Sequence, residues 1–129
     1  MKKTAAEEPV PALMGFITRM NEWEKRCIKA NAFHRGVLGA VFRDCCSPKA
    51  QGEVRLKAPF FNDPPDYDPA REKVLEIVHD TRNRVRIRTS AFKGEFPSEY
   101  RYLLRLLGGR WLVEAKQTIR QGKTIKALL

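Results

Sequence analysis

The fold is decided by residues 100–117, which read YRYLLRLLGGRWLVEAKQ. Two runs rich in apolar residues flank Gly108 and Gly109, and two consecutive glycines accept the positive φ angles of a two-residue hairpin turn. The stretch therefore predicts an antiparallel hairpin, with residues 100–107 in its first strand and residues 110–117 in its second.

Pairing the residues outward from this turn gives the hairpin one apolar face and one charged face. The apolar pairs are Leu106 with Trp111, Leu104 with Val113 and Tyr102 with Ala115. The pairs on the other face are Arg105 with Leu112, Leu103 with Glu114 and Arg101 with Lys116. An arginine opposite a lysine is unfavourable when no acidic group lies nearby. We therefore expect Arg101, Arg105 and Lys116 to form an unpaired basic patch, where an anionic partner gains most.

A second hairpin is predicted upstream, where residues 75–80 pair with residues 84–89 across the loop 81–83. Its ionic face holds the pairs Asp80 with Arg84, Val78 with Arg86 and Glu76 with Arg88. Its mostly apolar face holds the pairs His79 with Val85, Ile77 with Ile87 and Leu75 with Thr89. Asn83 suits the left-handed position of such a loop. In this register the first strand neutralises part of the arginine charge of the second.

Two helices are predicted before the sheet. Apolar residues recur at helical spacing over residues 13–28, and a second periodic set covers residues 33–45. Gly36 and Gly39 weaken the second helix but would let it pack closely against a neighbour. Five of the eight prolines fall in residues 48–69. Because proline disrupts helices and internal strands, we expect an ordered loop there, anchored by its aromatic side chains.

These elements predict a single α+β domain over residues 1–129, in which the helices cover one face of a curved antiparallel sheet. The expected order is a flexible start at 1–10, helices over about 11–47, the proline-rich loop at 48–69 and the sheet over about 73–120. The sequence does not decide the structure of the tail that follows Gln117, since residues 120–129 fit either a short strand or a helix.

The composition points to a globular protein with an anionic partner. The chain has 25 Lys and Arg against 15 Asp and Glu, a net charge of +10, and 43% of its residues are hydrophobic. This balance excludes a disordered tract and a membrane protein. No apolar run is long enough to cross a membrane, and the first residues lack the apolar core of a secretion signal. We therefore expect a cytoplasmic protein.

The sequence carries no recognisable catalytic or phosphate-binding motif, and we expect no catalytic residue, no cofactor and no metal site. Cys27, Cys45 and Cys46 match neither a disulfide framework nor a zinc site, so they are expected to be reduced thiols. His79, together with Asp44 or a tyrosine, is the best candidate for a general acid or base, although a structural role is favoured.

Two other classes of function compete with a protein-binding role. A small-molecule-binding domain or enzyme would use a pocket lined by Trp23, His79, Tyr102 and Trp111, although core packing is favoured for the tryptophans. A nucleic-acid-binding module would use the basic last third of the chain. Against it, acidic residues alternate with the arginines, and no exposed aromatic stacking motif is present.

Four motifs together carry a resemblance to a known family. They are Met20-Asn21-x-Trp23-Glu24, Pro65-x-Tyr67-Asp68-Pro69-x-x-Glu72-Lys73-Val74, Tyr100-x-Tyr102-x-Leu104 and Gly109-x-Trp111-Leu112. In this order the chain resembles bacterial immunity proteins of polymorphic toxin systems with a nuclear-transport-factor-2-like fold. The similarity covers about residues 13–117. The arginine-rich strands and the strongly basic total depart from the family's pattern.

The resemblance implies a cone-like α+β domain that protects its own cell by binding and blocking a cognate toxin. It carries over no catalytic residues. We expect Arg101, Arg105 and Lys116, and then Arg86 and Arg88, to meet an acidic surface of the toxin. The acidic loop of Asp63, Asp66 and Asp68, which predicts turns rather than a calcium site, is an alternative docking surface. The oligomeric state stays open, with a homodimer through the sheet as one option.

Overall fold

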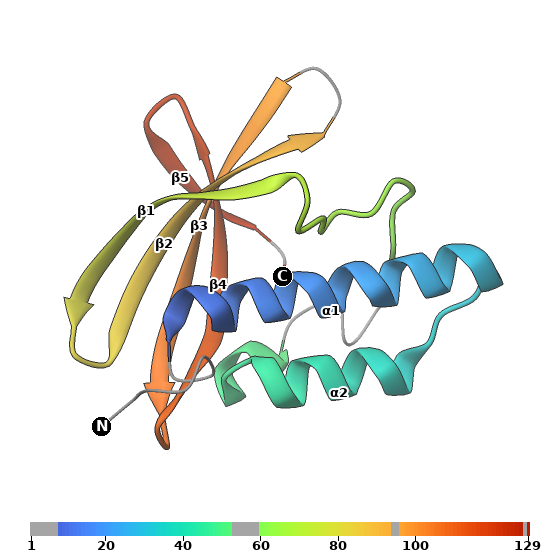
Figure 1. Ribbon diagram of the computed structural model, residues 1–129, viewed down its shortest axis with the longest axis horizontal. Helices are drawn as coiled ribbons and strands as arrows, with labels where there is room; N and C mark the ends of the chain where they lie inside the picture. Colours follow the sequence, from blue (N-terminus) through green and yellow to red (C-terminus); the bar gives the residue numbers. More distant parts are fainter. Residues whose placement is uncertain (1–7, 53–59, 94–95, 128) are drawn as a thin grey trace.

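The computed structural model describes residues 8–52, 60–93, 96–127 and 129, and these residues form helices followed by a sheet (Figure 1). The helices are α1 (Pro9–Ala30), α2 (Arg35–Cys45) and the short 3-10 helix η2 (Pro48–Gly52). The strands are β1 (Glu72–Thr81), β2 (Arg84–Lys93), β3 (Phe96–Leu107), β4 (Arg110–Arg120) and β5 (Lys123–Ala127). Over the described residues they make one antiparallel sheet of five strands in the order β1-β2-β3-β4-β5. The predicted α+β fold is confirmed.

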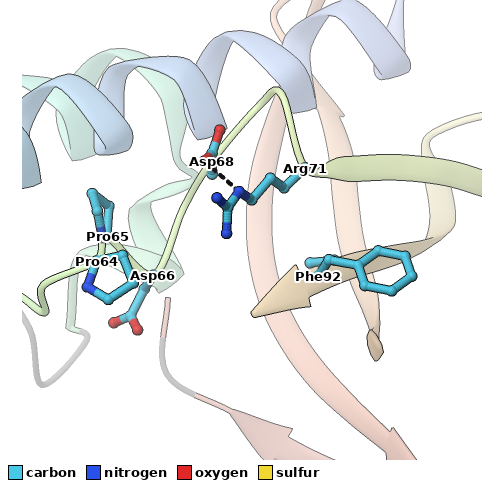
Figure 2. A pocket seen from close by; sticks show the side chains of 7 residues that line it. Pro64, Pro65, Asp66, Asp68, Arg71 and Phe92 are labelled. Carbon is cyan, nitrogen blue, oxygen red and sulfur yellow. Dashed lines mark ion pairs between the residues drawn. The ribbon is translucent and has the colours of Figure 1, made fainter. Parts of the chain in front are cut away.

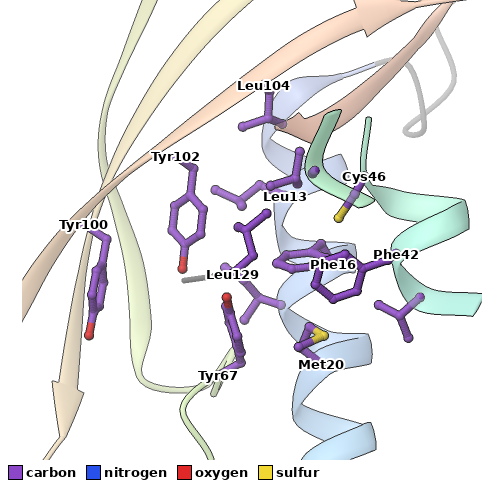
Figure 3. Packing of buried hydrophobic residues seen from close by; sticks show 14 of the residues in the cluster. Leu13, Phe16, Met20, Phe42, Cys46, Tyr67, Tyr100, Tyr102, Leu104 and Leu129 are labelled. Atoms are coloured by element: carbon purple, nitrogen blue, oxygen red, sulfur yellow. The ribbon is translucent and has the colours of Figure 1, made fainter. Parts of the chain in front are cut away.

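Both long helices lie on one face of a strongly twisted sheet, and the core lies between the two layers (Figure 1). The predicted apolar stripe of α1 is buried there, with Leu13, Phe16, Ile17 and Met20 fully inaccessible to solvent (Figure 3). Phe16 packs edge-on against Phe42 of α2, with ring centroids 6.0 Å apart. The expected alternation of buried and exposed side chains thus sets which face of the sheet receives the helices.

The helix ends differ in detail from those expected. α1 begins at Pro9, two residues before the expected start, and proline is well suited to the first helical position. The rest of the expected flexible start, residues 1–7, lies outside the described residues.

The two glycines of α2 do not mark a close helix contact. A Cβ added at Gly36 or Gly39 would meet nothing within 4 Å. The expectation that these glycines allow close packing is therefore wrong.

The hairpin at Gly108 and Gly109 is confirmed, with positive φ angles of 56° and 78° at its two turn residues. The confirmed pairs are Leu106 with Trp111, Arg105 with Leu112 and Leu104 with Val113. The expected pairs Tyr102 with Ala115, Leu103 with Glu114 and Arg101 with Lys116 are wrong. A bulge leaves Glu114 without an opposite residue, so Ala115 pairs with Leu103 and every later residue of β4 changes face.

The hairpin of β1 and β2 is also confirmed, with irregularities at both of its ends. The confirmed pairs are Glu76 with Arg88, Ile77 with Ile87, Val78 with Arg86 and His79 with Val85. The expected pairs Asp80 with Arg84 and Leu75 with Thr89 are wrong, because Thr81 and Val74 take those places. The turn is therefore closed over Arg82 and Asn83, and Asn83 does not have a positive φ.

The inner face of this hairpin is covered only on the β2 side. Val85 and Ile87 are almost fully buried, whereas Leu75 is 47% exposed and Ile77 is 41% exposed. β1 is an edge strand of the sheet, and His79 near its end is exposed as well. The predicted apolar face of β1 thus extends past the part of the sheet that the helices cover.

The described part of the proline-rich loop is held by a buried carboxylate of α1. Glu24 is fully inaccessible to solvent, and its Oε2 accepts hydrogen bonds from the backbone N–H groups of Asn62 (3.2 Å) and Asp66 (3.0 Å). Its Oε1 accepts one from the backbone N–H of Tyr67 (3.0 Å). Asn21, one turn earlier, donates its amide to the Tyr67 carbonyl (2.6 Å). Residues 53–59 of the expected loop lie outside the described residues.

Aromatic side chains anchor the same loop, as predicted. Tyr67 packs edge-on against Phe16, with ring centroids 5.4 Å apart, and Phe61 packs against Phe33 at the same separation.

The tail, whose structure the sequence left undecided, forms a strand. The chain turns at Gln121 and Gly122 and continues as β5. The side chain of Leu129 is buried in the core (Figure 3).

Replacing Glu24 tests the contact between helix and loop. We expect Glu24→Gln to lower the free energy of unfolding by about 1–3 kcal/mol, because the amide nitrogen would meet a backbone N–H that the carboxylate now accepts. Urea denaturation followed by circular dichroism measures this change. Glu22→Gln, at an exposed position of the same helix, is the control. Equal losses in both variants would contradict the assignment.

The pH dependence of the same contact has a definite sign. Burial raises the pKa of Glu24 above its ordinary value of 4.5, although the three backbone N–H donors oppose this shift. The folded state then binds more protons than the unfolded state, so Glu24 stabilises the fold less as the pH rises through its folded-state pKa. The stability difference between wild type and Glu24→Gln should narrow as the pH rises above 4.5. A difference that widens would be inconsistent with a raised pKa.

Candidate functional site

The face of the sheet opposite the helices is open in the part of the chain that the structure describes (Figure 1). Strands β2 and β3 direct arginines to it, because their alternate residues Val85, Ile87, Tyr102 and Leu104 point into the core. The arginines are Arg84, Arg86, Arg88, Arg101 and Arg105, which we call the arginine face. Arg84 lies directly opposite Arg105, and Arg88 lies directly opposite Arg101. Such like-charge pairs destabilise a sheet unless other groups compensate.

Acidic residues of the same face compensate three of the five arginines. Arg86 binds Asp80 through two nitrogens, with Nε 2.8 Å from Oδ2 and Nη2 2.8 Å from Oδ1. Arg88 lies between two strands, with Nη1 2.8 Å from Glu99 and Nε 3.6 Å from Glu76. The predicted neutralisation of Arg86 and Arg88 by the first strand of their hairpin is thus confirmed.

Arg105 is paired as well. Its Nε lies 3.3 Å from Oε1 of Glu114, the residue that the bulge leaves without an opposite neighbour. The expectation of an unpaired Arg105 is therefore wrong. Arg84 and Arg101 make no ion pair with any residue that the structure describes. Arg101 was predicted, whereas Arg84 was missed because the expected register paired it with Asp80.

Lys116 lies inside the protein and not on the arginine face. The bulge at Glu114 turns its side chain to the helix side of the sheet, where only 5% of it is exposed. Its Nζ lies over the rings of Tyr100 (4.2 Å to the centroid), Tyr67 (4.4 Å) and Tyr102 (5.6 Å). These distances fit cation–π contacts, which are strongest when the site is dry. Lys116 is therefore removed from the predicted contact surface.

A buried acid, Glu72, lies near Tyr102, one of the three tyrosines that surround Lys116. The hydroxyl of Thr89 donates to Oε2 of Glu72 at 2.6 Å, and both residues are buried. Burial, and next the charge of Glu72, raises the pKa of Tyr102 well above its ordinary value. Tyr102 is thus a neutral phenol at physiological pH, which suits a structural role next to a buried cation.

The structure does not bring the four predicted pocket residues together. Trp23 is 1% exposed and donates its indole N–H to the carbonyl of His34 (2.9 Å), a contact that fits the favoured core role. Tyr102 is buried beneath Lys116, while His79 is exposed on the edge strand. Trp111, the second residue of β4, is 9% exposed. His79 has no hydrogen bond to Asp44, which instead pairs with Arg19.

The hollows on the described surface are small. One of about 20 Å³ lies between the loop and β2, lined by Pro64, Pro65, Asp68, Arg71 and Phe92 (Figure 2), and has room for about one water molecule. In it Arg71 pairs with Asp68 across 3.6 Å. A second hollow, of about 160 Å³, lies between α1 and α2, and a third, of about 200 Å³, lies where these helices meet β4.

Other kinds of site have little support within the described ranges. No group of three or more His, Cys, Asp and Glu side chains there is arranged to hold a metal ion. Cys27, Cys45 and Cys46 form no disulfide bond in the described structure. Among the described helices, none has the length and apolar character needed to cross a membrane.

Sequence reasoning missed the buried polar pair of α1. Asn21 and Glu24 are three residues apart and lie on the apolar face of the helix, and both are buried. Their position in the apolar stripe was the available signal, because buried polar groups need partners. Their partners lie in the loop that contains Tyr67, so two of the four motifs are in direct contact.

Comparisons with known proteins agree with this architecture. The model of the family described as NTF2 fold immunity protein matches residues 8–127. No curated protein and no solved structure matches the chain.

Chemical labelling tests the burial of Lys116. We expect N-hydroxysuccinimidyl acetate to modify Lys116 at least about tenfold more slowly than Lys123 and Lys126, because acylation of a buried amine requires local opening. Both comparison lysines lie on β5 and are exposed. Peptide mass spectrometry over a time course measures the three rates. Equal rates for the three lysines would contradict the burial of Lys116.

Proposed function

We propose that this chain, which belongs to the NTF2 fold immunity protein family, binds a cognate toxin and neutralises it by protein–protein contact. The family indicates an immunity protein of toxin systems and suggests a role without catalysis. The toxin of such a system is encoded beside its immunity protein, so the proposed partner is the product of the adjacent reading frame.

The arginine face supports this proposal most directly. Like charges lie directly opposite each other on neighbouring strands, at Arg84 with Arg105 and at Arg88 with Arg101. Two of these arginines, Arg84 and Arg101, have no acidic partner among the described residues. Carboxylates of a bound partner would relieve this repulsion. An acidic surface of the toxin is therefore the proposed counterpart, with a contact of roughly 800 Å² per partner.

The paired arginines contribute geometry rather than net charge. Asp80 holds Arg86 and Glu99 holds Arg88 in fixed positions at 2.8 Å, so little side-chain freedom is left to lose on binding. Arginine is also among the residues that contribute most to protein interfaces. Arg86, Arg88 and Arg105 thus present a rigid frame around the two arginines that lack an ion pair.

The acidic loop fits a docking role less well. Asp66 accepts a hydrogen bond from the Asn62 side chain (2.7 Å), and Asp68 accepts one from the backbone N–H of Ala70 (2.9 Å). These carboxylates stabilise the turns of the loop, as predicted, and Arg71 offsets the charge of Asp68 across 3.6 Å. A homodimer through the arginine face is disfavoured as well, because it would place the arginines of two copies opposite each other.

Binding to nucleic acid is the competing interpretation of the same surface. Four carboxylates, Glu76, Asp80, Glu99 and Glu114, lie among the five arginines of the described outer face. They would repel phosphates at close range, whereas a protein surface can present both signs of charge. A protein partner is therefore the better match.

Charge reversal tests the proposed surface. Arg84→Glu/Arg101→Glu breaks no ion pair of the described fold. We expect it to weaken binding to the toxin at least about tenfold, because two carboxylates would face an acidic surface. Lys25→Glu/Lys29→Glu on exposed positions of α1 changes the net charge equally and is the control.

The experiment co-expresses each variant with the product of the adjacent reading frame. Growth rescue and co-purification report neutralisation and binding, and circular dichroism confirms that each variant is folded. Wild-type protection by the arginine variant would refute the assignment of this face. Failure of the wild type to bind the toxin would refute the proposed function itself.

A further inference from the structure

The hollow of about 200 Å³ lies on the helix side of the sheet, so it is separate from the arginine face. It is formed where α1 passes the end of α2 and the start of β4. Its lining includes Gly15 and Arg19 of α1, Asp44 and Cys45 of α2, and Arg110 and Trp111 of β4. Nothing in the proposed toxin contact uses these residues.

Two guanidinium groups line this hollow beside a single carboxylate. Nη1 of Arg19 donates to Oδ2 of Asp44 at 3.0 Å, and Nη2 of Arg110 donates to the Asp44 backbone carbonyl at 2.6 Å. Nε of Arg43 lies 3.8 Å from the other Asp44 oxygen. The Asp44 carboxylate thus pairs with two arginines, while Arg110 binds the backbone carbonyl of the same residue. Each lining arginine keeps a further nitrogen that makes no hydrogen bond within the described chain.

The remaining walls suit a small apolar group. Trp111 supplies an indole ring that is 9% exposed, and Cys45 supplies a half-buried thiol. Burial raises the pKa of Cys45, although Arg19 opposes this, so the thiol stays neutral. The volume is below the range of roughly 300–1,000 Å³ that is typical of sites for drug-sized ligands. The hollow therefore fits a group the size of one amino-acid side chain.

Gly15 lines the hollow without contributing a side chain. Glycine weakens the interior of a helix relative to alanine, and a Cβ at this position would meet nothing within 4 Å. No packing contact therefore requires glycine here. Because Gly15 lines the hollow, a longer side chain would occupy it.

We propose that this hollow binds a carboxylate carried on a short apolar stem. The N–H groups of Arg19 and Arg110 that make no hydrogen bond within the described chain donate to the carboxylate oxygens, a geometry that guanidinium groups favour, and Trp111 contacts the stem. A free organic acid and an acidic side chain of another protein share this chemistry. The proposal does not depend on toxin binding through the arginine face.

Titration of the full-length, ¹⁵N-labelled protein tests the site. The free-acid probe is 3-phenylpropionate, and the protein-derived probe is an acetylated, amidated peptide with a central glutamate. NMR signals of the Arg19 and Arg110 side chains and of the Trp111 indole should shift with saturation for at least one probe. The tighter probe identifies the source of the carboxylate. Absence of saturable shifts with both probes would overturn the proposal.

Two matched comparisons make the result specific. Gly15→Leu should abolish the shifts, whereas Gly36→Leu should leave them unchanged, because Gly36 is also an exposed helical glycine with free space but does not line the hollow. The neutral analogue 3-phenylpropanamide should bind at least about tenfold more weakly than the acid. Equal binding of acid and amide, or equal binding by wild type and Gly15→Leu, would overturn the site.

Discussion

The hydrogen bonds of one buried carboxylate connect the helical layer to the sheet. Glu24 accepts hydrogen bonds from three backbone N–H groups of the loop that leads into β1. Asn21 donates a hydrogen bond to a backbone carbonyl of the same loop. This contact places Tyr67 against Phe16 on one side and against Lys116 on the other. A buried carboxylate that accepts no hydrogen bonds would destabilise the core by several kcal/mol. The core is therefore complete only when the loop is in place.

Local sequence rules predicted the fold well and failed at single-residue irregularities. The ladder counted from Gly108 and Gly109 is correct as far as Val113, because alternation and turn geometry act over short distances. It fails at Glu114, where a bulge lets Lys116 reach the tyrosines and lets Glu114 reach Arg105. Both contacts depend on the extra residue at the bulge, which changes the residues of β3 and β4 that face each other. Strand periodicity carries no information about them.

The candidate site was predicted in part for the same reason. Alternation correctly directed Arg86, Arg88, Arg101 and Arg105 outward, since it depends only on which residues share a face. Their partners depend on side-chain reach across strands, as the contact of Arg88 with Glu99 shows. The hollow at Arg19 draws on two helices and a strand, so its assembly required the folded chain.

The irregular edge of the sheet affects how the protein behaves at high concentration. β1 is an open edge with two exposed aliphatic side chains, Leu75 and Ile77, a combination that usually invites edge-to-edge aggregation. Leu75 and Asp80 interrupt the regular pairing of this strand, so it does not offer a long, straight template to a neighbouring chain. Its irregularities therefore favour solubility in a crowded cell, where a straight edge of the same composition would promote fibrous assembly.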